Sequence, residues 1–293
     1  MATEPRYKSI DGDDLYRRLA LGEAMVLLDV RTEAEFAARH IPGSVLIPLQ
    51  QLETRVQEVP VNGKPVAVIC EHGIRSHAAC RYLAEYGVPS LYNLAGGLDH
   101  WPGPVRAGTP SNGAGHDHAI APAPFLVEHF DLLPSGVALD LAMGEGRNAI
   151  YLASRGFDVD GVDVDPAAVA RARASARKLG TPIRAVIGNV EDGTYILPME
   201  AYDVIVVFRY LHRPLFRDIL EGLKPGGVVV YQTFNVDQGQ FGRPTNPAHL
   251  LRHGELKEVF SDWTILDWRE GIEGGAAGHP PCALSGIVAR KPA

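Results

Sequence analysis

Residues 70–76 read Cys70-Glu71-His72-Gly73-Ile74-Arg75-Ser76, and they decide the fold of the first part of the chain. The preceding residues, 65–69, are apolar and rich in β-branched side chains, which predicts a buried strand. In residues 76–83 the apolar positions have helical spacing. Cys70 is therefore predicted to lie where a strand ends and a helix begins.

This position predicts a reactive thiol at Cys70. The backbone N–H groups of such a loop and the N-terminus of the following helix both favour an anion over neutral sulfur. Arg75 supplies a planar fork of donors for a bound oxyanion, and Gly73 lets the backbone curl without a Cβ clash. The alternative is a buried and inert cysteine, the commonest fate of a single thiol. The glycine, the arginine and the strand-to-helix context favour the nucleophile.

The first hundred residues resemble the rhodanese family of sulfurtransferases. The similarity lies in three further stretches, LLDVR at 27–31 with Glu33, Glu35 and Phe36, HIPGS at 40–44, and LAGGL at 94–98 with Trp101. The resemblance implies that Cys70 takes a sulfane sulfur from a donor such as thiosulfate, holds it as a persulfide and passes it to a thiophilic acceptor. It assigns the remaining loop residues to the sulfur donor, namely Glu71, His72, Gly73, Ile74 and Ser76.

Two details of this resemblance bear on its chemistry. Four residues separate Cys70 from Arg75. The related phosphatases have one residue more, so the spacing favours sulfur over phosphate. Arg39 stands before the His-Ile-Pro sequence, where the family usually has glycine. Of the other two cysteines, Cys80 is predicted to be a core thiol of the helix, and Cys282 is assigned no chemistry.

Length and composition predict two soluble globular domains, and the strand and helix patterns predict the α/β class. The chain has 293 residues, 46% of them hydrophobic, and contains no apolar run long enough to span a membrane. Only three cysteines and a polar start without a secretory apolar region indicate a reducing, cytoplasmic compartment. The net charge of −7 favours small-molecule partners, and neither nucleic acid nor membrane is expected as a partner.

A domain boundary is predicted where proline and glycine concentrate, between residues 102 and 124. The expected division is a first domain over 1–106, a linker over 107–122 and a second domain over 123–293. His116, Asp117 and His118 lie in this linker, but no further cysteine or histidine follows at a metal-binding interval. No metal site is predicted.

The second domain alternates strands and helices. Strands are predicted at 136–142, 158–163, 183–187, 202–207 and after a turn at 223–227, with a last strand after Cys282. A glycine loop and a helix follow the first of them, and a second helix is predicted to begin at Asp165-Pro166 and to end at 179. The pattern is typical of a Rossmann-like fold with a mostly parallel sheet.

From about residue 119 to its end the chain resembles class I methyltransferases that use S-adenosylmethionine. The matching residues are the loop from Asp140 to Gly146, the acid Asp163, the pair Gly188-Asn189 and the turn from Lys224 to Gly227. The resemblance implies that Asp140 belongs to the cofactor site, that Gly144 and Gly146 approach the methionyl part of the cofactor and that Asp163 binds the ribose hydroxyls. It also implies that Asn189 and Val190 frame the adenine. Asn189 replaces a more common aspartate, and Ala142 a frequent glycine.

The methyltransferases associated with tellurite resistance are the narrower resemblance, through residues 146–149 and 208–215. Arg209, His212 and Arg213 are the predicted binders of an anionic acceptor. Methyl transfer to a chalcogen anion needs mainly alignment and desolvation, so cations suffice. The alternative is that Arg209 and Arg213 are solvated and that His212 packs in the domain.

The two resemblances predict a bifunctional enzyme with a small sulfane-sulfur donor and a small methyl acceptor. One hypothesis is a relay in which sulfur delivered by Cys70 is methylated by the second domain. Another is detoxification of tellurite, selenite or a related oxyanion. The alternatives are that only one domain is catalytic while the other senses or docks, or that the acceptor is a thiolated macromolecule. The donor, the acceptor, the coupling of the sites and the oligomeric state stay open.

Overall fold

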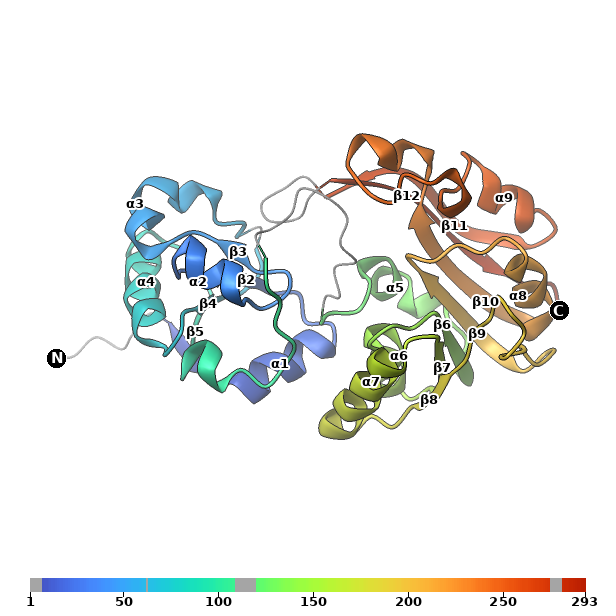
Figure 1. The fold of residues 1–293 in the computed structure, drawn as a ribbon, viewed down its shortest axis with the longest axis horizontal. Coiled ribbons are helices and arrows are strands. Elements are labelled where there is room, and N and C mark those ends of the chain that lie inside the picture. The colour runs from blue at the N-terminus through green and yellow to red at the C-terminus, as the bar shows by residue number, and fades with distance from the viewer. Residues whose placement is uncertain (1–6, 62, 109–119, 275–280) are drawn as a thin grey trace. The chain divides into compact units, whose positions relative to one another are not determined.

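A computed structural model describes residues 7–61, 63–108, 120–274 and 281–293. The described chain forms two compact units (Figure 1). The first contains residues 7–108 except 62, together with 120–121 and 274, and the second contains 122–273 and 281–293. Within these ranges, no helix combines the length and the apolar character that crossing a bilayer requires.

The first unit is built on a five-stranded sheet with the order β1-β5-β4-β2-β3, in which every pair of neighbours is parallel. Its strands are β1 Lys8–Ile10, β2 Val26–Asp29, β3 Val45–Leu46, β4 Val66–Ile69 and β5 Leu91–Leu94. Its helices are α1 Gly12–Ala20, α2 Glu33–Ala38, α3 Leu52–Arg55 and α4 Ile74–Glu85. All residues of β2 and β4 are buried, as expected for central strands of a parallel sheet.

The strand and helix predicted around Cys70 are confirmed as β4 and α4. The helix begins at Ile74, two residues before the predicted start, because Gly73 adopts a left-handed conformation (φ 85°) and ends the loop. Leu83 and Cys80 of α4 join Val68 of β4 in the hydrophobic core of the unit. The loop that carries Cys70 is therefore fixed at both ends by buried elements.

The second unit has a seven-stranded sheet with the order β11-β12-β10-β9-β6-β7-β8. Its strands are β6 Val137–Leu141, β7 Asp158–Asp163, β8 Arg184–Ile187, β9 Tyr202–Phe208, β10 Leu223–Phe234, β11 Thr264–Glu273 and β12 Cys282–Arg290. Its helices are α5 Pro124–Glu128, α6 Arg147–Ser154, α7 Pro166–Leu179, α8 Leu215–Gly222 and α9 Glu255–Val259. The strands from β10 to β8 are parallel, and β12 and β11 add an antiparallel edge.

The predicted α/β architecture with a mostly parallel sheet is confirmed. Two details differ from the prediction. Residues 223–227, predicted as a turn, belong to β10 and coincide with a register shift between Leu223 and Val228. The strand β11 was not predicted, because its sequence is half polar and most of its residues are only partly buried.

Alternating residues of the central strands fill two cores, one on each face of the sheet. Leu139 of β6 and Ile205 of β9 lie in one cluster, and Ala138 and Val204 lie in the other. Such two-sided burial is typical of a parallel sheet covered by helices on both faces. The open positions are thus at the strand ends, where the candidate site residues of this unit lie.

The helix α7 shows how local sequence fixes an element. The carboxylate of Asp165 accepts a hydrogen bond from the backbone N–H of Ala167 (2.8 Å), and Pro166 occupies the first helical position. The helix ends at Leu179 because Gly180 adopts φ 67°. Both predicted limits of this helix are confirmed.

Candidate active sites

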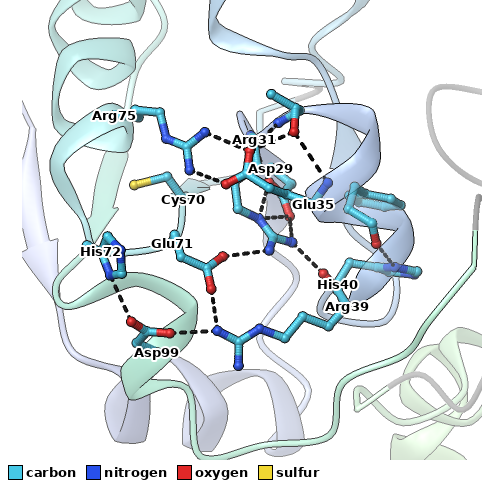
Figure 2. A network of polar contacts seen from close by, with 12 residues as sticks. Asp29, Arg31, Glu35, Arg39, His40, Cys70, Glu71, His72, Arg75 and Asp99 are labelled. Carbon is cyan, nitrogen blue, oxygen red and sulfur yellow. Dashed lines mark hydrogen bonds and ion pairs between the residues drawn. The ribbon is translucent and has the colours of Figure 1, made fainter.

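The thiol of Cys70 lies directly after β4 and is buried (1% exposed). The backbone N–H of Gly73 donates to Cys70 Sγ (3.1 Å), and the hydroxyl of Ser76 lies 3.2 Å from the sulfur. Figure 2 shows the thiol beside a group of charged side chains. A backbone donor and a hydroxyl so close to the sulfur can hold a sulfur anion.

The stretch 94–98 closes the loop from the far side. The backbone N–H groups of Leu98 and Asp99 donate to the carbonyl oxygens of Cys70 (2.8 Å) and Glu71 (3.2 Å). A Cβ placed on Gly97 would lie 2.4 Å from these same two oxygens, so only glycine allows this approach. The separated sequence motifs 70–76 and 94–98 thus form one structural element.

A buried ion pair ties the loop to the first core strand. Arg31 and Asp29 are both fully buried, and Arg31 Nη2 donates to Asp29 Oδ2 at 2.6 Å. Arg31 Nη1 reaches Glu71 Oε2 (2.8 Å) in the loop. Sequence reasoning used residues 27–31 only for the resemblance to the rhodanese family and missed this role. The apolar Leu-Leu run that ends in Asp-x-Arg was the available signal, since such charges are rarely buried unless paired.

Arg39, the residue in place of the family's glycine, is part of this network. Its guanidinium contacts Glu71 and also donates to Asp99 Oδ1 (2.6 Å), while His72 Nδ1 lies 2.8 Å from Asp99 Oδ2 (Figure 2). Burial opposes ionisation of Glu71, but the hydrogen bonds from Arg39 and Arg31 keep its pKa below the ordinary value. Arg39 therefore adds salt bridges to Glu71 of the loop and to Asp99.

The segment 40–44 is packed into the unit. His40 is buried, stacks on the Phe36 ring (4.0 Å between centroids) and lies 2.9 Å from the Phe36 carbonyl oxygen through Nδ1. Its backbone pairs with Arg106. These contacts give His40 a structural part beside the site.

Arg75 is held by a carboxylate. Its Nη1 and Nη2 donate to the two oxygens of Glu35 (2.8 and 2.5 Å), in the bidentate geometry typical of strong ion pairs. The hydrogen bonds from Arg75 hold the pKa of Glu35 well below its usual range. The fork of donors predicted for an oxyanion is thus present near the loop but is shared with Glu35.

Cys80 is fully buried on α4. Burial, assisted by the nearby charge of Cys70, raises the pKa of Cys80 to about 12. It is the core thiol that was predicted, and it is unreactive at neutral pH.

In the second unit, Asp140 connects the strand before the glycine loop to the helix after it. Its side chain is buried in β6, and its Oδ2 accepts the backbone N–H of Ala149 in α6 (2.9 Å). Burial raises the pKa of Asp140 to about 7. Asp140 therefore anchors the start of α6.

The loop and the acid of the next strand are joined directly. The backbone N–H of Gly144 (φ 56°) donates to Asp163 Oδ2 (2.7 Å), and Asp163 Oδ1 accepts from the N–H of Asp165 (2.9 Å). Gly146 (φ 77°) lies so close to α7 that a Cβ there would stand 2.9 Å from the Cβ of Ala172. Asp163 is half-buried at the carboxyl end of β7, where ligands bind in open α/β sheets.

The next residue, Val164, was missed by sequence reasoning. It is 63% exposed, a high value for an apolar side chain beside a half-buried acid. A carboxylate suits two vicinal hydroxyls, and an exposed apolar side chain suits the face of a purine. The residues after β7 therefore fit the ribose and the base of an adenosine cofactor.

Asn189 and Val190 follow β8. Asn189 Oδ1 accepts the N–H of Glu191 (2.8 Å), and Nδ2 donates to Asp192 (3.0 Å), so this side chain closes its own loop. Val190 is partly buried against the hydrophobic core. Their contact with an adenine stays a prediction.

The three predicted acceptor residues have different surroundings. Arg213 is bound by the buried Glu255 (2.6 Å) and by two carbonyl oxygens, which gives it a structural part, and its contact with an acceptor stays a prediction. His212 Nδ1 lies 3.8 Å from Glu191. Arg209, in a left-handed conformation (φ 58°) just after β9, keeps its guanidinium over the Phe234 ring (4.5 Å) at the carboxyl edge of the sheet. Arg209 is the best placed of the three.

Cys282 opens β12, as predicted, and lies beside Arg209. The distances from its Sγ to Arg209 Nη2 and Nη1 are 3.6 and 3.7 Å. Sequence reasoning gave Cys282 no partner, because the two residues are far apart in the chain. Of the residues that the structure describes, no three histidine, cysteine or acidic side chains are grouped so that they could hold a metal ion. His116, Asp117 and His118 lie outside the described residues.

The geometry thus defines a thiol-based α/β transferase unit and an open-sheet unit built for an adenosine cofactor. Comparisons with known proteins agree. Residues 11–103 match the family described as rhodanese-like domain, and residues 138–227 match the family described as methyltransferase domain. Through its first unit the chain belongs to the rhodanese-like sulfurtransferases, and its second unit contains a methyltransferase domain.

Two relatives match the first unit over most of their own length. A sulfurtransferase of Allochromatium vinosum is 38% identical over 101 residues, which are 34% of this chain and 91% of that protein. The thiosulfate sulfurtransferase GlpE of Pseudomonas syringae is 34% identical over 79 residues, 27% of this chain and 74% of that protein. These relatives show the family of the first unit.

A solved structure is similar to the chain in fold. TehB from Haemophilus influenzae has a TM-score of 0.50 and 22% identity, over 58% of this chain and 63% of that one. The chain thus spans less than two thirds of TehB. At this identity the likeness concerns the fold.

Proposed function

We propose that the chain is a bifunctional enzyme that transfers sulfur through a persulfide on Cys70 and methylates a small acceptor with S-adenosylmethionine. The observation that carries the proposal is the cradle of Cys70. Its sulfur lies at the end of a buried parallel strand, within reach of the Gly73 N–H and the Ser76 hydroxyl. Donors so placed stabilise a sulfur anion before and after it accepts sulfur.

The sulfur-transfer step balances without a redox partner. The Cys70 thiolate attacks the outer sulfur of thiosulfate, the S–S bond of the donor breaks, and sulfite leaves with the bonding electron pair. The product is the Cys70 persulfide anion. A thiophilic acceptor then attacks its outer sulfur and releases the Cys70 thiolate.

The rim of the site supports an anionic donor. Arg75 lies five positions after Cys70 and is partly exposed (31%) although Glu35 binds it. A sulfonate group has the same bidentate match to guanidinium as a carboxylate, so it competes with Glu35 for Arg75. Arg75 is our proposed binder of the donor's oxygens, His72 and Ile74 form the exposed part of the loop, and Glu71 is partly buried.

In the methyltransferase unit, the residues at the strand ends bind and orient. Asp163 receives the ribose hydroxyls, Val164 with Val190 packs on the adenine, and the loop of Gly144 and Gly146 accommodates the methionyl part. When bound, S-adenosylmethionine supplies an electrophilic methyl group. No side chain needs to move a proton if the acceptor is already an anion.

Arg209 supports an anionic acceptor. Its guanidinium is half-buried, at the same edge of the sheet as Asp163, where an anion gains more from a cation than it does in bulk water. A reduced sulfur, selenium or tellurium species satisfies this requirement, and reduced sulfur is also what the first unit transfers. The similarity of residues 146–149 and 208–215 to the tellurite-resistance type supports the heavier chalcogens.

The test measures both activities on the purified full chain. Wild type, Cys70→Ser and the control Cys80→Ser are incubated with thiosulfate and a thiol acceptor, and separately with methyl-labelled S-adenosylmethionine and sulfide, selenite, tellurite or thiols. We expect Cys70→Ser alone to lose sulfur transfer. Methylation that requires Cys70 supports the relay, and methylation indifferent to it leaves two independent enzymes.

Two results would contradict the proposal. Sulfur transfer that survives Cys70→Ser excludes the persulfide route. Methylation of none of these acceptors, with cofactor binding intact, excludes a small chalcogen acceptor and favours a thiolated macromolecule, or a sensing role for the second unit.

A further inference from the structure

The strand β5 places a buried amide behind the Cys70 site, and neither the sulfur chemistry nor the sequence motifs assign it a part. The Ser76 hydroxyl, 3.2 Å from Cys70 Sγ, donates to Asn93 Oδ1 at 2.6 Å. Ser76 is fully buried, and Asn93 is 6% exposed. The three side chains come from three different elements, the loop after β4, the helix α4 and the strand β5.

A hydroxyl has one hydrogen, so Ser76 can donate to only one neighbour at a time. While Cys70 is a neutral thiol, its S–H donates to Ser76 Oγ and the Ser76 hydrogen goes to Asn93 Oδ1. The thiol hydrogen, the Ser76 hydroxyl and Asn93 Oδ1 then all have partners. This is the arrangement that the 2.6 Å contact describes.

A sulfur anion at Cys70 reverses the requirement. The thiolate or persulfide has no hydrogen to give, so Ser76 must turn its hydroxyl to the sulfur and gives up its bond to the Asn93 oxygen. The amide of Asn93 can rotate and present its NH₂ to Ser76 Oγ, because an amide offers an acceptor and a donor of the same size. A carboxylate at this position can only accept.

We propose that Asn93 is a positioning residue for sulfur transfer, which turns its amide as Cys70 changes charge and thereby lets Ser76 donate to the sulfur anion. The inference rests on the proposed persulfide function of Cys70. The other charged or titratable groups that face Cys70 are Arg75 and Cys80 from α4 and Glu71 of the loop. They attract or repel the charge from a distance, whereas Ser76 and the Gly73 N–H meet the sulfur itself.

The test uses three substitutions in the full chain. Asn93→Asp keeps the size but fixes an acceptor, so the Ser76 hydrogen stays with residue 93. Asn93→Ala removes the acceptor and frees the hydroxyl to turn to the sulfur. Ser76→Ala removes the donor. The readout is the rate at which iodoacetamide alkylates the Cys70 peptide, followed by mass spectrometry from pH 5 to 10.

We expect Asn93→Asp and Ser76→Ala to react about tenfold more slowly than wild type at pH 7, because a hydrogen bond to a charged group is lost. The midpoint of their rate–pH curves should move upward by about one pH unit, with an unchanged rate at high pH where the thiolate is complete. Asn93→Ala should stay within about threefold of wild type. Thermal unfolding reports damage to the fold separately.

Equal alkylation curves for Asn93→Asp and Asn93→Ala would overturn the inference, since both variants lose the native amide and only aspartate keeps an acceptor that holds the Ser76 hydrogen. A Ser76→Ala curve identical to wild type would overturn it as well. Alkylation needs no sulfur donor. A failure of the persulfide proposal would therefore appear only as sulfur transfer that persists in Cys70→Ser.

Discussion

The Cys70 loop and the Gly144–Gly146 loop share one geometry and use it in opposite ways. Each follows a buried parallel strand, and each leads into a helix that is preceded by a glycine in the left-handed region without a side-chain cap, Gly73 for α4 and Gly146 for α6. In the first unit the loop turns its N–H toward the protein's own sulfur. In the second unit Asp140, on the strand before the loop, accepts a hydrogen bond from the backbone of the first helical turn.

Under the proposed function, the first loop carries the nucleophile of the protein itself, whereas the second loop binds a cofactor. The first loop carries its reacting atom, so charged side chains surround it and hold it in place (Figure 2). In the second unit, the loop contributes two glycines, and the half-buried Asp163 and the exposed Val164 beside it are our proposed contacts for a bound cofactor. The same strand–loop–helix therefore gives two kinds of chemistry, according to which group occupies its centre.

The sharpest way to test the anchoring side of this comparison is Asp140→Asn. Burial raises the pKa of Asp140 to about 7, above its unfolded value of about 4. Between these values the folded chain binds more protons than the unfolded chain, so the free energy of unfolding of the second unit falls as the pH rises from about 4 to 7. Asparagine keeps the acceptor for Ala149 and removes the charge.

We therefore expect Asp140→Asn to lose this fall and to be more stable than wild type at pH 8 by about 2–4 kcal/mol. Denaturant unfolding at pH 4, 6 and 8 measures the difference. If the unfolding free energies of the two proteins changed with pH in the same way, ionisation of Asp140 would cost nothing in the folded state. The view that burial raises the pKa of this anchor would then be wrong.

Asp163→Asn tests the ligand side. If Asp163 binds the ribose hydroxyls, loss of its charge should weaken S-adenosylmethionine binding about tenfold to a hundredfold, near 1.5–3 kcal/mol. Calorimetric titration measures the affinity, and Asp158→Asn, an exposed acid at the start of the same strand, is the control. Equal affinities of all three proteins would exclude Asp163 from the cofactor site.

Gly146→Ala separates the two reasons for a glycine in the loop. Its φ of 77° is left-handed, and an added Cβ would also stand 2.9 Å from the Ala172 Cβ. Gly180 has a similar φ of 67° but nothing within 4 Å of its Cβ. We expect Gly180→Ala to cost about 1 kcal/mol in unfolding free energy and Gly146→Ala about 1–2 kcal/mol more. Equal losses would mean that the approach of α7 to the loop is not constrained by the glycine.

The smallest effect is expected from Glu35→Gln, on the helix α2, whose side chain binds Arg75. It leaves Arg75 in place but removes the charge that binds it, so an anionic sulfur donor should gain access and its KM should fall about twofold to fivefold. Steady-state sulfur transfer from thiosulfate measures this, with Glu33→Gln on the same helix as the control. An increased KM would show instead that the ion pair positions Arg75 for the donor.

The parts that sequence reasoning predicted well depend on local signals. The limits of α7 follow from Asp165, Pro166 and Gly180, which act within a few residues of each helix end. The strand before Cys70 follows from a continuous apolar run. The strand β11 was not predicted, because an edge strand with one solvated face lacks a continuous apolar run.

What sequence reasoning missed at the sites is the pairing of predicted cations with carboxylates far away in the chain. Arg75 meets Glu35 across 40 positions, and Arg213 meets Glu255 across 42. Spacing indicates which residue types are present but does not show that a predicted cation already holds a carboxylate. Sequence therefore predicted the elements of both sites, and the tertiary structure decides which of their charges are available.

The persulfide on Cys70 is the central claim, and one measurement tests it directly. Purified protein is incubated with thiosulfate and desalted, and its peptides are mapped by mass spectrometry. We predict the added mass of one sulfur atom on the Cys70 peptide of wild type and Cys80→Ser, lost on treatment with cyanide and absent from Cys70→Ser. No added sulfur on Cys70, or sulfur found on Cys282 instead, would contradict the account.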